Sequence, residues 1–181
     1  ATSISSSAGD LALGSADEFT FMATLKPNDP GAFSGVFFCT SGNSNDIAFQ
    51  AYITPSQQVG VDFNEEAIAL LSATTYDCDG VQPLAIVVTY DRTLANNNAK
   101  LYVNGKLEDT ADYTTVFSGT TSQTVWIASD NVQGAEKYSG FVEEITFHSK
   151  AAYVPTTPSS FLLPTRELAD LSAGNSKFYN G

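Results

Sequence analysis

The sequence predicts an all-β protein: a two-sheet antiparallel β-sandwich of the jelly-roll type with an extended C-terminal arm. The first observation is the two-residue alternation of residues 19–25, where Phe19, Phe21 and Leu25 share one face, as in a half-buried strand. The second is a series of similar short segments separated by turn residues, and the third is the scarcity of helical patterns. Together these observations favour two stacked sheets.

Further strands are expected in order along the chain. Each is a short run rich in β-branched or aromatic residues and bounded by Gly, Asn, Asp or Pro. They span residues 34–39, 47–53, 59–63, 67–72, 84–90, 99–103, 124–128 and 141–148. Asn104-Gly105 is a two-residue hairpin signal, so it predicts that residues 100–103 pair with residues 106–109.

The pattern divides the chain into a sandwich at residues 1–150 and an arm at residues 151–181. The arm contains Pro155, Pro158 and Pro164, and Thr165 is placed to cap one short helix at 165–171. Its charges cancel, so the net charge of −12 belongs to the sandwich. We expect the arm either to wrap its own sandwich or to dock on a neighbouring chain.

Charge and composition narrow the partners. The chain has 8 basic and 20 acidic residues, which argues against nucleic acid and against an anionic membrane surface. Its longest aliphatic run, 84–88, is too short to cross a bilayer. Only 15% of the residues are charged, against about 25% in typical soluble domains. An uncharged, hydroxyl-rich surface is common in extracellular and virion β-proteins, so we expect one of these locations.

Four stretches, in this order, resemble the laminin-G-like, concanavalin-A-like family. They are Phe19-Thr20-Phe21 with Lys26-Pro27, then residues 85–91 with 100–106, then residues 126–129, and finally residues 138–145 with Phe147. The resemblance implies a curved two-sheet sandwich used for adhesion, glycan binding or particle decoration. The chain is a divergent member, because it has Gln82-Pro83 where the family often has Trp-His. The start of the arm, residues 153–155, resembles the tails of such domains in bacteriophage structural proteins.

No catalytic residues are expected. Glycosidases need two carboxylates that face each other across the sugar, and Glu143 and Glu144 are adjacent, so a regular strand would point them to opposite faces. Nucleophilic catalysis is equally hard to build, since His148 is the one histidine and there is no Gly-x-Ser-x-Gly motif. The prediction is therefore a protein that is not an enzyme.

Glu143 alternates with Phe141, Ile145 and Phe147, which predicts that it faces the core. A carboxylate there must be hydrogen-bonded, paired or metal-bound, so we expect a structural role or calcium ligation. The family resemblance implies that this position ties the last strand to the N-terminal segment, in some members with calcium nearby. Asp77 and Asp79 form a fragment of a calcium-loop pattern. Calcium is the one possible cofactor, and none is required.

A glycan site would need exposed aromatic side chains beside hydrogen-bonding groups. The candidates are loop residues with these side chains: Tyr76, Asp77, Asp79, Asn131 and Tyr138. Trp126 is expected to point away from the face that Val125 and Ile127 share, in a structural role. Cys39 and Cys78 are either a disulfide or two buried thiols.

The function predicted from these observations is a non-enzymatic surface module that makes protein–protein contacts, as a virion or particle decoration or adhesion domain. Its partners would be subunits of a larger particle, and it would act as a homo-oligomer or as part of an assembly. The alternative is a carbohydrate-binding module that recognises a surface glycan, with or without the help of calcium. A glycoside hydrolase is the least favoured hypothesis.

Overall fold

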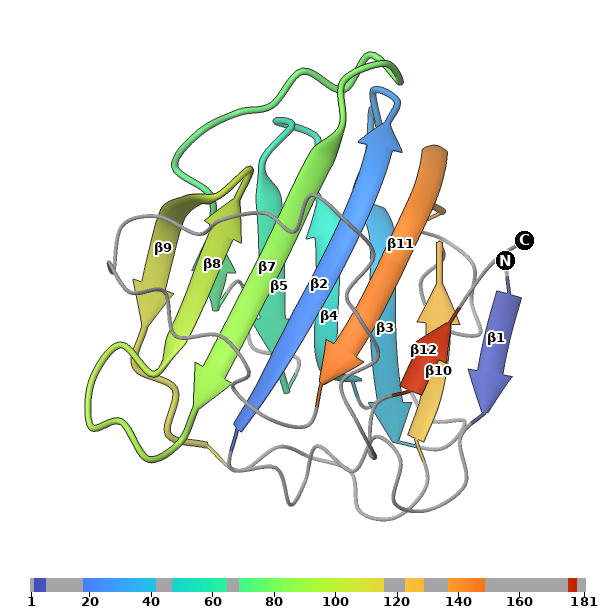
Figure 1. Cartoon of the computed structure of the whole chain (residues 1–181). Coiled ribbons are helices and arrows are strands. Elements are labelled where there is room, and N and C mark those ends of the chain that lie inside the picture. The colour runs from blue at the N-terminus through green and yellow to red at the C-terminus, as the bar shows by residue number, and fades with distance from the viewer. Residues whose placement is uncertain are drawn as a thin grey trace.

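Two six-stranded antiparallel sheets lie face to face in the computed structural model, one in front of the other in Figure 1. The structure describes residues 2–5, 18–41, 47–64, 69–115, 123–128, 137–148 and 176–178. All the regular secondary structure in these described residues is β-strand. The fold is therefore the expected concanavalin-like sandwich.

Each sheet combines a run of strands that are consecutive in sequence with strands from distant parts of the chain. The first sheet runs in the order β1 (Thr2–Ser5), β10 (Gln123–Ile127), β3 (Ser34–Ser41), β4 (Ile47–Ile53), β5 (Val59–Phe63) and β6 (Leu70–Leu71). The second sheet runs in the order β12 (Ser176–Phe178), β11 (Gly140–His148), β2 (Glu18–Pro27), β7 (Leu84–Asp91), β8 (Ala99–Val103) and β9 (Lys106–Ala111).

The core lies between the sheets and is built largely from aromatic rings. Phe19 and Phe21 of β2 are fully buried, because alternate residues of a strand point to the same side. The Phe19 ring packs edge-to-face on Phe49 with 5.4 Å between centroids and stacks on Phe147 at 5.1 Å. These contacts join β2 and β11 of one sheet to β4 of the other.

The predicted strands agree closely with the observed ones. Asn104 and Gly105 have φ angles of 49° and 81°, which is the left-handed pair that a tight hairpin turn requires, and β8 and β9 pair across them. Strand β6 is shorter than expected. Strands β1 and β12 were not predicted, and β12 pairs with β11 of the same chain. The expected helix at 165–171 lies outside the described residues.

Strand β11 contains a β-bulge, and this makes the prediction for Glu143 wrong. Val142 pairs with Leu25 and Glu144 pairs with the preceding residue, Thr24, so Glu143 is an extra residue in the ladder. The bulge turns Glu143 outward, where it forms a 2.8 Å ion pair with Lys26. Phe141, which also was expected to face the core, is 67% exposed for the same reason.

Cys39 and Cys78 are both buried, and they are not joined in a disulfide. Each belongs to the hydrophobic core cluster, so of the two alternatives the structure has the buried thiols. Burial raises the pKa of Cys39 to about 12, which leaves it protonated and unreactive at neutral pH.

Carboxylates of β9 bridge the edges of the two sheets. The Asp109 carboxylate accepts a 2.8 Å hydrogen bond from the Leu71 backbone nitrogen of β6. Glu108 accepts hydrogen bonds from the Thr74 backbone nitrogen at 2.8 Å, the Thr74 hydroxyl at 2.9 Å and the Lys106 ammonium at 2.8 Å. The Glu108 side chain has no exposed surface. Side-chain hydrogen bonds from β9 thus connect the edge of the second sheet to β6 and to Thr74, although β6 and β9 belong to different sheets.

These hydrogen bonds predict an acid-sensitive contribution to stability. Burial raises the pKa of Glu108, but the bonds from Lys106, Thr74 and Tyr76 outweigh it and hold the pKa below the ordinary 4.5. Stability from a lowered pKa is present above the unfolded value and is lost as the pH falls through the folded value. We expect Glu108→Gln to lower the free energy of unfolding at pH 7 by about 1.5–3 kcal/mol, and by less in acid.

Urea unfolding of both proteins at neutral and at acidic pH measures this effect. The exposed Asp77→Asn variant is the control, because it removes one negative charge from a side chain without a hydrogen bond among the described residues, so its stability should match the wild type. A Glu108→Gln cost that does not shrink below pH 4.5 would contradict the assignment.

Candidate functional site

The outer face of the second sheet, which points away from the core, carries ordered rows of side chains. One row of successive cross-strand partners crosses all six strands: Lys177, Thr146, Met22, Val87, Tyr102 and Leu107. The next row contains Glu144, Thr24 and Ala85. The apolar middle of the first row therefore lies beside two polar residues of the second, because strand partners share a face.

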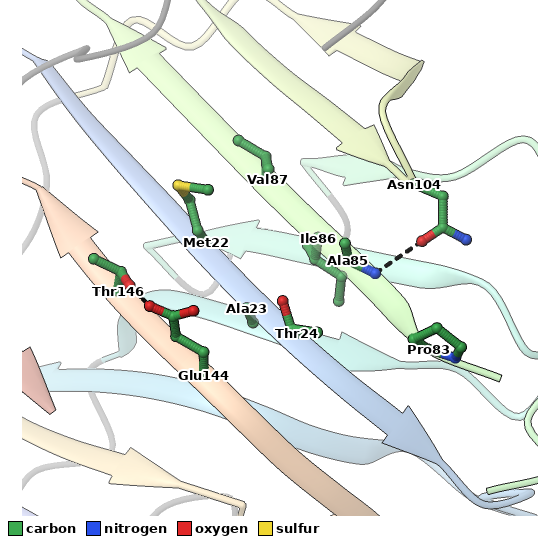
Figure 2. Close-up of a pocket in the computed structure, with 10 residues that line it drawn as sticks. All are labelled: Met22, Ala23, Thr24, Pro83, Ala85, Ile86, Val87, Asn104, Glu144 and Thr146. Carbon is green, nitrogen blue, oxygen red and sulfur yellow. Dashed lines mark hydrogen bonds between the residues drawn. The ribbon is translucent and has the colours of Figure 1, made fainter. Parts of the chain in front are cut away.

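A pocket of about 200 Å³ opens between these two rows (Figure 2). Its described lining residues come from β2, β7, β11 and the segments next to β7 and β8: Met22, Ala23, Thr24, Pro83, Ala85, Ile86, Val87, Asn104, Glu144 and Thr146. Ala23 and Ile86 also belong to the core cluster, so the pocket lies directly on the strands that cover the core.

The apolar part of the pocket is fixed by packing. Val87 is only 1% exposed and forms a small cluster with Tyr102, Met22 and Leu107. Because Val87 and Tyr102 are buried, the accessible apolar surface of the pocket comes from Met22, Pro83 and Ala85, which are partly or fully exposed. Such a surface suits the C–H face of a small ring.

Three polar groups at the pocket retain hydrogen-bonding capacity. The Asn104 side-chain oxygen accepts a 2.8 Å bond from the Ala85 backbone nitrogen, drawn as a dashed line in Figure 2, which leaves its amide nitrogen to donate. One Glu144 oxygen receives a weak 3.4 Å bond from the Thr146 hydroxyl. The other Glu144 oxygen and the Thr24 hydroxyl have no partner among the described residues. A ligand with several hydroxyl groups could pair with all three.

The bulge in β11 gives the two adjacent glutamates different surroundings. Glu144 lies opposite Thr24 on the outer face, as its alternation with the core residues Ile145 and Phe147 predicts. Glu143 is the extra residue of the bulge and does not face the core. The same irregularity directs Glu143 to Lys26, so the two adjacent carboxylates have separate neighbours.

Three of the residues that the sequence analysis named as glycan-binding candidates lie close together, but outside the pocket. Asp77, Asp79 and Tyr138 lie around Cys78 at the end of β2, where Asp79 bridges to Asn28. The Tyr138 hydroxyl donates to the Phe141 carbonyl at 3.2 Å.

Asp79 is engaged in its own turn. Its carboxylate accepts backbone hydrogen bonds from Val81 at 2.7 Å and Gln82 at 3.0 Å. These bonds lower the pKa of Asp79. Among the described residues no group of three or more His, Cys, Asp or Glu side chains is placed to hold a metal ion. Calcium binding by Asp77, Asp79 and Glu143 is not tested by this observation and stays a prediction.

The remaining candidates are dispersed. Tyr76 is hydrogen-bonded to Glu108; burial and the Glu108 charge raise the pKa of the phenol. Asn131 lies outside the described residues. Trp126 points away from the core that Val125 and Ile127 join, as predicted, and its indole nitrogen is buried without a partner among the described residues.

Known proteins share this fold. A laminin G family model, described as the concanavalin A-like lectin/glucanases superfamily, matches residues 2–154. No curated protein sequence matches the chain closely.

Three solved structures illustrate the likeness. The CBM40 module of Ruminococcus gnavus IT-sialidase has 17% identity and a TM-score of 0.61, with 81% of this chain and 92% of that one covered. A heptameric SAP-like pentraxin from Limulus polyphemus has 16% identity and a TM-score of 0.59, with 76% and 66% covered. Trypanosoma rangeli sialidase has 16% identity and a TM-score of 0.52, but this chain covers only 20% of it. At these identities the likeness establishes the fold alone.

The described part of the chain contains no helix that is long and apolar enough to span a membrane.

Proposed function

The chain belongs to the concanavalin A-like lectin/glucanases superfamily, and from this premise we propose that it is a non-enzymatic carbohydrate-binding module whose ligand occupies the pocket between β2, β7 and β11. The observation that carries the proposal is the pairing of an apolar floor with three polar groups that still have hydrogen-bonding capacity. A pyranose ring presents the matching pattern, since its C–H face is apolar and its rim carries hydroxyls.

The absence of turnover is part of the proposal. Hydrolysis of a glycosidic bond uses two carboxylates flanking the bond. Glu144 is the one carboxylate among the described lining residues of the pocket, and its neighbour Glu143 is paired with Lys26. The solved CBM40 module, whose structures include one bound to α2,3 sialyllactose, is a precedent for glycan binding by this fold.

Protein–protein contact is the second candidate, and exposed apolar side chains favour it. Val81 and Phe141 are 66% and 67% exposed, and they lie on segments that meet at the end of β2. Decoration of a virion or another particle, an extracellular location and assembly into oligomers are the finer forms of this proposal. A native mass that exceeds the monomer and falls on Phe141→Ala would support it.

A glycan array followed by calorimetry tests the carbohydrate proposal. We expect Ala85→Phe to weaken binding of the strongest array ligand by at least about tenfold, since the new ring fills the pocket from the outer face of β7. Ala73→Phe is the matched control, because Ala73 is exposed and does not line the pocket. Circular dichroism should be unchanged in both variants. Binding that survives Ala85→Phe, or no binding to any glycan, would refute the proposal.

A further inference from the structure

Part of the outer face of the second sheet is buried. Six residues point outward from neighbouring positions on β2, β7, β8 and β11, on the side away from the core: Thr20, Val87, Thr89, Tyr102, Thr146 and His148. All six are buried; Thr20 has no exposed surface and Thr89 is 7% exposed. We refer to these six residues as the covered face.

Neighbouring strands do not explain this burial. Glu144, Thr24 and Ala85 lie on the same outer face of β11, β2 and β7, and they are partly or fully exposed. Side chains on one face of a sheet stand side by side, so their outer ends are open to solvent unless something lies over them. The covered face therefore lies beneath another part of the molecule.

An apolar cluster on this face supports the same conclusion. Val87 and Tyr102 are buried together, with the partly buried Met22 and Leu107 packed against them, apart from the core between the sheets. Small satellite clusters of this kind occur beneath long loops. The covering segment is thus expected to contribute apolar side chains.

Residues 149–175 are the longest stretch outside the described residues, and both of its ends lie at this sheet. The stretch follows His148 of β11 and leads to Ser176 of β12, which pairs with Phe147. The other internal stretches outside the described residues join two strands of the first sheet or connect one sheet to the other. Residues 149–175 alone leave from the second sheet and return to it.

The length and composition of this stretch suit the covered face. Neighbouring strands are about 4.8 Å apart, so β8 lies about 14 Å from β11 across β2 and β7. An extended chain covers about 3.3 Å per residue, so residues 149–175 can cross these strands and return. The stretch contains the apolar run Phe161-Leu162-Leu163, and its basic and acidic residues balance. It therefore offers apolar side chains without adding charge.

We infer that residues 149–175 cross the outer face of the second sheet of their own chain and cover these six residues, with the apolar run over the cluster around Val87 and Tyr102. The arm thus wraps its own sandwich, which is one of the two alternatives that the sequence leaves open. The outer face that remains for a ligand or a partner is the row of Glu144, Thr24 and Ala85 and the sheet end beyond it.

Photo-crosslinking in the full chain tests the inference. Leu107→p-benzoylphenylalanine puts an apolar photoreactive ring at a partly buried position of the cluster. We expect a crosslink to a peptide from residues 149–175, in a product of monomer mass. Phe33→p-benzoylphenylalanine is the matched control, because Phe33 is exposed and precedes β3 of the first sheet, so it should not reach this stretch. A crosslink between two chains, or one from Leu107 to another segment alone, would overturn the inference.

Thiol labelling gives a second measurement. Thr89→Cys should react with a maleimide at least about tenfold more slowly than Ala85→Cys, because the covering segment must open first. Phe161→Asp should remove most of this difference by placing a charge in the apolar run, whereas Thr156→Asp, which adds the same charge outside the run, should not. Equal rates at positions 85 and 89, or a difference that Phe161→Asp leaves unchanged, would contradict the inference. Neither measurement uses a glycan, so the carbohydrate proposal is tested separately.

Discussion

Phe19→Ala is expected to lower the free energy of unfolding by about 3–5 kcal/mol, the usual cost of removing a buried ring from a packed core. The Phe19 ring contacts Phe49 and Phe63 of the opposite sheet as well as Tyr90 and Phe147 of its own. The cavity would open between the two sheets, where backbone held by strand ladders on both sides relaxes little. Such a loss is a large share of the about 5–15 kcal/mol typical of a whole domain.

Equilibrium unfolding in urea measures this cost as a lower midpoint with an unchanged slope. Phe141→Ala is the matched control, because the same side chain is removed from a position that is 67% exposed. It should change the free energy of unfolding by no more than about 0.5 kcal/mol. Similar costs for the two variants would show that Phe19 is not at the centre of the core.

The strands could be predicted because alternation is a local signal. Phe19, Phe21, Ala23 and Leu25 all face the core as their spacing predicts, and the Asn104-Gly105 turn has the expected backbone. Strands β1 and β12 were missed because Thr2–Ser5 and Ser176–Phe178 are short and lack alternating apolar residues; each is defined by the strand that it pairs with.

The site could not be predicted, because it depends on register between distant strands. Thr24 and Glu144 are 120 positions apart, and only the β2–β11 ladder sets them opposite each other. The bulge at Glu143 then reverses the alternation that sequence reasoning assumed. One available signal was the polar Thr20, Thr24 and Lys26 on the second face of β2, which marks an outer surface with hydrogen-bonding groups.

Asp79 shows how little a short spacing pattern establishes. Its spacing from Asp77 and the following Gly80 is typical of a calcium loop, but the same residues also build a tight turn. In the structure the Asp79 carboxylate accepts from Val81 and Gln82, and Gly80 adopts a φ of 76°. Two residue types with the same local preference cannot be separated by spacing alone.

Gly140→Ala should be the second most damaging change, at about 2–5 kcal/mol, as the sum of backbone strain and overpacking. Gly140 has a φ of 134°, a conformation that side chains disfavour. An added Cβ would lie 2.3 Å from the Lys26 carbonyl oxygen and 2.9 Å from the Pro27 Cα. Both are backbone atoms, so relief requires the first pair of the β2–β11 ladder to separate.

Gly31→Ala separates the two causes. Gly31 also has a positive φ, of 57°, but its added Cβ would meet nothing within 4 Å. That variant should therefore cost only the left-handed strain, about 1–2 kcal/mol. Because the strained pair, Gly140 with Pro27, begins the β2–β11 ladder that sets Glu144 opposite Thr24, Gly140→Ala should also weaken glycan binding in the folded protein, and Gly31→Ala should not. If Gly140→Ala and Gly31→Ala lowered the free energy of unfolding equally, the close approach of β2 would not be the reason for glycine at the start of β11. The backbone conformation alone would then require it.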